Sequence, residues 1–206
     1  MRILLTAYGP FGDVKENVTE EIANVILDDW NTDDGELKTL HLPVVWEKAR
    51  AMLVGAIDDF APDVIVSLGH AAGYPEPTIE TRYFNTAIGA DASGAHHLES
   101  VIDQGGPDSI DTNIDATKLL QHLKSKALPA RVHQGVEGMN YLCNFAGYVT
   151  MGHLKKTGKT TPFIFIHLPP ASVQIPLATL VRVVRETLVK ISVTPQTKVP
   201  HECGIC

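Results

Sequence analysis

The chain has 206 residues, 44% of them hydrophobic, and a formal net charge of −7. That length can bury one sizeable core, and the acidic balance argues against a surface that follows nucleic-acid phosphates. The N-terminal apolar run is too short for a signal sequence, and no apolar run approaches the roughly 20 residues that span a bilayer. We therefore expect a cytoplasmic protein that binds neither nucleic acid nor membrane.

Apolar runs rich in Ile, Val and Leu alternate along the chain with segments of helical period, which is typical of an α/β fold. The predicted strands cover residues 2–7, 37–45, 63–68, 131–136 and 162–168, with a further extended stretch at 78–85. The predicted helices cover residues 19–29, 46–60, 114–127, 143–154 and 176–191. Pro43 predicts that its strand ends early or lies at a sheet edge. Thr19 is expected to cap the first helix.

This pattern predicts a single domain over residues 1–192, built as a three-layer αβα sandwich. Its mostly parallel, twisted sheet is flanked by helices on both faces. The long polar loop at residues 87–109 has no predicted element, and such loops are commonly functional. Residues 193–206 are expected to form a poorly ordered tail, in which His201, Cys203 and Cys206 are incidental and not half of a zinc site.

Cys143 stands alone in mid-chain, between a predicted strand and the helix that starts beside it. Three cysteines in a chain of this size argue against a disulfide framework and for a free thiol. A thiol attacks as the thiolate, which the positive end of a helix and an adjacent imidazolium both stabilise. Cys143 is therefore a candidate nucleophile, and the alternative is a small buried side chain without a chemical role.

His167 and Glu80 are candidate partners for this cysteine. His167 comes at the carboxyl end of the predicted strand 162–168, and ligands of open α/β sheets bind outside the carboxyl ends of the strands. Glu80 follows the third strand and its loop, so we expect it on the same side, where a carboxylate can orient an imidazole. The alternatives are a hydrogen-bonded core or rim histidine and a solvated surface glutamate.

Residues 6–12 end the first strand in a Gly/Pro turn that presents Tyr8 and Phe11 at the same end of the sheet. The turn lacks both the G-x-G-x-x-G pattern and the lysine of a Walker loop. An apolar pocket wall is therefore favoured over a phosphate site.

Together these stretches resemble the pyroglutamyl peptidases, cysteine peptidases that remove an N-terminal pyroglutamate from peptides. The resemblance runs from residue 1 to about residue 191. It rests on L-T-A-Y-G-P-F-G at 5–12, L-P-V-V-W at 42–46, L-G-H-A-A-G at 68–73, I-E at 79–80, G-P-D at 106–108, Y-L-C-N at 141–144 and I-H-L-P at 166–169. Two departures touch the pocket: His70 stands where most members have glutamine, and only Asp91-Ala92 suggests the family's D-A-R-I-P-D-N run.

The resemblance implies that Cys143 is the nucleophile, His167 its base and Glu80 the carboxylate that orients the base. The residues that it implies for substrate binding are Tyr8, Phe11, His70, Tyr141 and Leu142. The expected reaction removes a pyroglutamyl residue from a peptide with a blocked N-terminus through a thioester, with no metal or cofactor. We also expect that the chain could form a homo-oligomer, either a dimer or a tetramer.

Two other functions remain open on the sequence. His70, His96, His97 and Glu80 are of the residue types that bind zinc, so a metal-dependent hydrolase is one alternative. The other is a non-catalytic binding module on the same fold, in which the altered loops have made the active site inactive. A retired thiol would react slowly with iodoacetamide at neutral pH.

Overall fold

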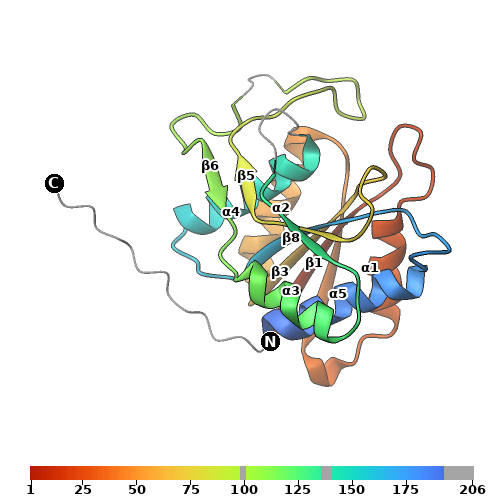
Figure 1. Cartoon of the computed structure of the whole chain (residues 1–206). Coiled ribbons are helices and arrows are strands. Elements are labelled where there is room, and N and C mark those ends of the chain that lie inside the picture. The colour runs from red at the N-terminus through yellow and green to blue at the C-terminus, as the bar shows by residue number, and fades with distance from the viewer. Residues whose placement is uncertain (98–100, 136–140, 193–206) are drawn as a thin grey trace.

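The computed structural model describes residues 1–97, 101–135 and 141–192, and its centre is a six-stranded sheet (Figure 1). The strand order is β2 (Glu36–Leu42), β1 (Arg2–Tyr8), β3 (Val64–His70), β8 (Phe163–Leu168), β4 (Thr78–Glu80) and β7 (Arg131–His133). Within this described sheet β4 runs antiparallel to β8, and the other neighbouring pairs are parallel. The predicted mostly parallel sheet is therefore confirmed. Both expectations from Pro43 hold as well, because β2 ends at Leu42 and lies at an edge.

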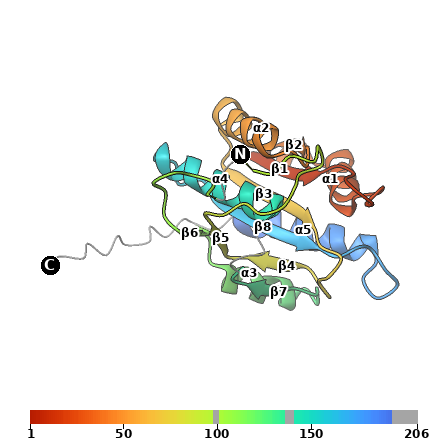
Figure 2. The ribbon, with the colours of Figure 1, turned by 90° about the horizontal axis from the view of Figure 1, so that it is seen from above.

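Five α-helices of the described chain cover both faces of the sheet. One core cluster joins the sheet to α1 (Val18–Asp28), α3 (Ala116–Ser125) and α5 (Leu177–Ser192). The other joins it to α2 (Trp46–Phe60) and α4 (Leu142–Lys156). Neighbouring residues of β1 show the alternation, since Ile3 belongs to the first cluster and Leu4 to the second. Figure 2 shows α2 and α4 on one side with α3 and α5 on the other, which confirms the three-layer sandwich.

The extended stretch predicted at residues 78–85 divides between two sheets. Its first part is β4, and its second part is β5 (Arg82–Phe84), which pairs antiparallel with the unpredicted β6 (Ser109–Asp111). Between them, the Thr81 N–H donates to the carbonyl of His133, and the Thr81 carbonyl accepts from Thr112. The chain leaves the main sheet at this residue because its two hydrogen-bonding groups serve different partners.

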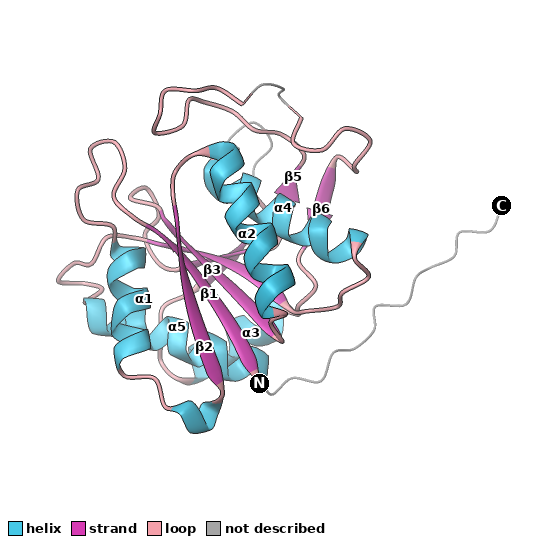
Figure 3. Cartoon of the chain, turned by 180° about the vertical axis from the view of Figure 1, so that it is seen from behind, coloured by secondary structure: helices cyan, strands magenta, loops and turns pink. Residues whose placement is uncertain are grey.

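Two helix starts are capped by residues that the sequence did not indicate. Asn17, and not the expected Thr19, caps α1, because its Oδ1 accepts from the Thr19 N–H at 3.1 Å. The carboxylate of Asp91 accepts from the N–H of Trp46 at 3.2 Å, and α2 has no cap from its neighbouring residue Val45. α2 packs mainly against α4 and β2, and Figure 3 shows it beside both. Asp91 thereby fastens the loop after β5 to the start of α2.

Three further features concern the start of β2, the end of the chain and its helices. A short 3-10 helix, η1 (Thr32–Asp34), precedes β2. The predicted tail at residues 193–206 lies outside the described residues. Within the described ranges, no helix has the length and apolar character needed to cross a membrane.

Candidate active site

Glu80, His133 and His167 meet on one face of the sheet, the face that α2 and α4 cover. In the register of the strands, Glu80 lies opposite His133 of β7 and opposite Phe165 of β8. Phe165 packs in the cluster of α2 and α4, and His167 is two residues further along the same strand. Because side chains two apart on a strand share a face, His167 and Glu80 point to the same side.

The position of Glu80 corrects one expectation from the sequence. We expected a glutamate at the carboxyl edge of a parallel sheet, but β4 runs antiparallel to β8. Thr78 therefore lies opposite His167, while Glu80 lies further in, opposite Phe165. With only 6% of its surface exposed, Glu80 is a buried carboxylate and not a solvated one.

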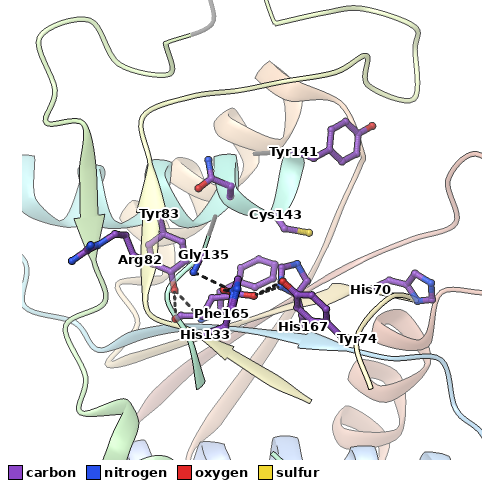
Figure 4. A pocket seen from close by; sticks show the side chains of 12 residues that line it. His70, Tyr74, Arg82, Tyr83, His133, Gly135, Tyr141, Cys143, Phe165 and His167 are labelled. Atoms are coloured by element: carbon purple, nitrogen blue, oxygen red, sulfur yellow. Dashed lines mark hydrogen bonds and ion pairs between the residues drawn. The ribbon is translucent and has the colours of Figure 1, made fainter. Parts of the chain in front are cut away.

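Both oxygens of the Glu80 carboxylate are hydrogen-bonded to imidazoles, those of His133 and His167, which Figure 4 labels. Nδ1 of His167 lies 2.8 Å from Oε1, and Nδ1 of His133 lies 2.9 Å from Oε2. The hydroxyl of Tyr74 also donates to Oε1 at 3.3 Å. Burial by itself would raise the pKa of Glu80, but the hydrogen bonds and charges of His167 and His133 lower it below its usual value. The carboxylate is thus ionised and fixed in orientation.

Cys143 is the second residue of α4, where the positive end of the helix dipole lies. Tyr141, the N-cap residue, makes no side-chain hydrogen bond to the first turn. The sequence prediction of a cysteine at a helix N-terminus is therefore confirmed. On the sheet side, a β-carbon built on Gly69 would lie 2.9 Å from Sγ of Cys143, and Gly69 is the residue paired with His167. Because Gly69 has no side chain, the sulfur of Cys143 can lie directly against the sheet.

The charge of His167 responds to Cys143 and Glu80. Burial alone would lower the pKa of His167, but the negative charge of Cys143, a hydrogen bond with it and the Glu80 carboxylate raise it to about 10. A charged imidazole is therefore favoured beside Cys143. Such a pair supplies a nucleophile together with an acid that can protonate a leaving group.

The start of α4 is fastened to β5 by polar contacts. Oδ1 of Asn144 accepts from the Phe84 N–H at 2.7 Å, and Nδ2 donates to the carbonyls of Phe84 and Thr86 at 2.9 Å each. One turn later, Gly147 lets the ring of Tyr83 approach, because a β-carbon on Gly147 would lie 2.2 Å from that ring. These contacts hold the first turn of α4, and with it Cys143, at a set distance from the sheet.

An open pocket surrounds the sulfur and the two imidazoles. Of the residues predicted from the sequence, those that line it are His70, Glu80, Tyr141, Cys143 and His167. The other lining residues are Tyr74, Arg82, Tyr83, His133, Gly135, Asn144 and Phe165. Sequence reasoning missed His133, because the strand predicted over residues 131–136 put it in mid-strand, whereas β7 ends at His133.

The remaining predicted substrate residues lie beneath or beside this pocket. Tyr8 is buried at 3% exposure, and its hydroxyl donates to the carbonyl of Leu142 at 3.1 Å. Burial and the nearby charge of Cys143 raise the pKa of Tyr8 well above its usual value. Leu142 is buried at 1% exposure. The ring of Phe11 stands edge-on to His70 with 6.5 Å between the ring centroids.

The alternative of a metal site has no set of ligands among the residues that the structure describes. Within the ranges that the structure describes, no three His, Cys, Asp or Glu side chains are grouped so that they could hold a metal ion. Glu80 is bonded to His133 and His167, and Nε2 of His97 lies 3.4 Å from a carboxylate oxygen of Glu47. The histidines at 70, 96 and 97 therefore do not join Glu80 in one site.

Comparisons with known proteins agree on one family. The sequence model of the family described as Pyroglutamyl peptidase matches residues 1–187. A pyrrolidone-carboxylate peptidase of Pyrococcus furiosus is 32% identical over 172 residues, which cover 82% of this chain and 81% of that protein. A mutant pyrrolidone carboxyl peptidase from the same organism superposes with a TM-score of 0.83 at 25% identity, covering 93% and 98% of the two chains. Pyroglutamyl peptidase I of Bacillus amyloliquefaciens shares the fold, with a TM-score of 0.85 at 22% identity over 94% and 97% of the chains.

Proposed function

Because the chain belongs to the pyroglutamyl peptidase family, we propose that it is a cysteine peptidase that removes an N-terminal pyroglutamyl residue from peptides. The observation that carries this proposal is the 2.8 Å contact between His167 and the buried Glu80, with Cys143 against the same imidazole. Nucleophile, base and orienting carboxylate are the three parts that acyl transfer through a thiol needs.

In the proposed mechanism, His167 holds the proton that leaves Cys143, and the thiolate attacks the carbonyl carbon of the pyroglutamyl residue. The imidazolium then protonates the leaving amine, and water hydrolyses the thioester with His167 as base. The N–H groups at the start of α4 are natural donors to the tetrahedral oxyanion. Losing one such donor typically costs about 3 kcal/mol in the transition state.

Substrate binding is assigned to the residues around the opening of the pocket. Phe11, His70 and Tyr141 would contact the lactam ring, with Tyr8 and Leu142 supporting the site from below. Burial lowers the pKa of His70, and the charge of His167 lowers it further, so the ring of His70 is neutral. A neutral lactam offers no charge for an ion pair, so a neutral wall selects it by shape and a few hydrogen bonds.

The proposal extends to features of the whole chain. We place the enzyme in the cytoplasm and assign residues 1–192 to one domain that works without a cofactor. We also propose a homo-oligomer, a dimer or a tetramer, for which size-exclusion chromatography with light scattering is the direct test.

Hydrolysis of a panel of fluorogenic aminoacyl amides tests the function, with the wild type and Cys143→Ser measured side by side. We expect the pyroglutamyl amide to be cleaved at least about 100-fold faster than the prolyl amide, because the prolyl amine is charged and lacks the lactam carbonyl. Cys143→Ser should lose this activity. Equal rates for the two proteins would exclude a cysteine peptidase. An inactive wild type with slow iodoacetamide labelling would support the binding-module alternative.

A further inference from the structure

His133 holds the second oxygen of Glu80, and the proposed mechanism gives it no role. The register of β4 and β7 places the two residues directly opposite each other, with 2.9 Å between Nδ1 and Oε2. His167 holds Oε1 of the same carboxylate at 2.8 Å. The Glu80 side chain is 7% exposed, so solvent screens the three charges poorly. A change of charge on His133 is therefore felt by His167.

The contacts around Nδ1 of His133 make the position of one proton decisive. The N–H of Gly135 donates to this nitrogen at 3.1 Å, and Oε2 of Glu80 lies 2.9 Å from the same nitrogen. A ring nitrogen carries either a proton or a lone pair in the ring plane. With a proton, Nδ1 donates to Glu80. With a lone pair, it accepts from Gly135 and gives Glu80 no hydrogen bond. Because Glu80 is ionised, we assign the proton to Nδ1, so that His133 and His167 each donate to one oxygen of the carboxylate.

We propose that His133 is a positioning residue that controls, through Glu80, how firmly His167 holds its proton. The inference rests on the proposed function, in which Cys143 and His167 act as a thiolate and imidazolium pair. Neutral His133 donates one hydrogen bond, which fixes the plane of the Glu80 carboxylate. The negative charge of Glu80 then stabilises the imidazolium of His167. When His133 takes up a second proton, its positive charge offsets that of Glu80. The pair then loses stabilisation, so the enzyme loses activity on the acid side.

The other groups near His133 leave Glu80 as its principal ionic partner. Among the described lining residues of the pocket, Glu80 is the one carboxylate. The other titratable or charged groups that line the same pocket are Tyr74 before β4, Arg82 of β5, His70 of β3, His167 of β8 and Cys143 of α4. Tyr74 meets the His133 ring edge-on at 5.9 Å between centroids, and Arg131 of β7 lies over the Tyr74 ring. Arg82 is paired with Asp111 at 2.6 Å, which offsets its charge.

Two substitutions at this position separate orientation from titration. His133→Asn places an amide where Nδ1 lies, so it can still donate to Glu80 but does not change its charge with pH. His133→Phe keeps the ring shape and removes the donor. His122→Gln is the matched control, because Nε2 of His122 lies 2.8 Å from Glu186 in another half-buried histidine and carboxylate pair. Thermal melting of each variant checks that it folds.

The readout is the rate of Cys143 alkylation by iodoacetamide as a function of pH, which needs no peptide substrate. We expect the wild-type rate to fall on the acid side with the uptake of two protons, and that of His133→Asn with the uptake of one. After normalisation at about pH 7.5, His133→Asn should react at least about threefold faster than wild type near pH 5. His122→Gln should follow the wild type. Superimposable normalised profiles for wild type and His133→Asn would overturn the proposal, as would slow alkylation of the wild type at every pH.

Peptidase kinetics add a second criterion and keep the two proposals apart. On the pyroglutamyl amide, His133→Phe should lower kcat by about tenfold with little change in KM, and His133→Asn should retain kcat within about threefold at the optimum. Equal losses in the two variants would contradict the positioning role. If the wild type cleaves no pyroglutamyl amide but shows the alkylation profile described, the proposed function fails while the role of His133 stands.

Discussion

Cys143 packs against Gly69, the residue of β3 that lies directly opposite His167 in the sheet. A β-carbon on Gly69 would lie 2.9 Å from the sulfur and 2.6 Å from the ring of Phe165, closer than such contacts can be. The nucleophile and its base therefore come together because β3 carries no side chain at this position. The relationship makes the site sensitive to a single methyl group.

We expect Gly69→Ala to lower kcat/KM by at least about 100-fold, because the sulfur must move away from His167. Overpacking should also lower the free energy of unfolding by about 1 to 3 kcal/mol. Gly73→Ala is the matched control from the loop that follows, since a β-carbon there meets no atom within 4 Å. Steady-state kinetics and urea unfolding measure the two effects. Full activity in Gly69→Ala would show that Cys143 does not need its present position.

Glu80→Gln is expected to lower kcat by about 100-fold or more, because an amide presents its own N–H groups to the two imidazoles and removes the negative charge. Without that charge, the pKa of His167 should fall and Cys143 should be alkylated more slowly at neutral pH. Glu186→Gln, which removes the partner of His122 on the other face, serves as control. An unchanged alkylation rate in Glu80→Gln would remove Glu80 from the site.

His167 links folding stability to pH with a definite sign. Its pKa is raised from 6.5 to about 10 in the folded chain, although burial opposes the shift, because Cys143 and Glu80 favour the charged ring. This stabilisation is complete below about pH 6.5 and is lost as the pH rises toward 10. Urea unfolding should therefore show the free energy of unfolding falling over this window by about 2 kcal/mol more in wild type than in His167→Phe. Parallel curves for the two proteins would contradict the raised pKa.

Tyr8→Phe is expected to act on catalysis through the first turn of α4. The Tyr8 hydroxyl donates to the carbonyl of Leu142 at 3.1 Å, and that carbonyl belongs to the same peptide group as the N–H of Cys143. Losing the bond should lower kcat by about threefold to tenfold at unchanged KM, if that N–H stabilises the oxyanion. Tyr148→Phe is the control, since its hydroxyl donates to Pro107 at 2.8 Å. Equal kcat in both variants would count against a role for this peptide group.

Local patterns were sufficient for much of the fold and for two parts of the site. The helix predicted at residues 46–60 is α2 from end to end, because its apolar residues recur at helical spacing. Cys143 at a helix start and His167 near the end of a strand follow from the same kind of local reasoning. Each of these features depends on residues within a few positions of one another.

Contacts between distant segments decided the rest. The amino acids of β4 do not reveal that the strand runs antiparallel to β8, yet this direction buries Glu80 between two imidazoles. Likewise, Asp91 caps α2 at Trp46, and His133 reaches Glu80 from a strand 53 positions away. The amino-acid sequence alone determined which residue types could do the chemistry and the local elements that carry them. Only the tertiary structure decided which oxygen meets which imidazole, because hydrogen bonds across a sheet depend on strand order and direction, which local periodicity does not encode.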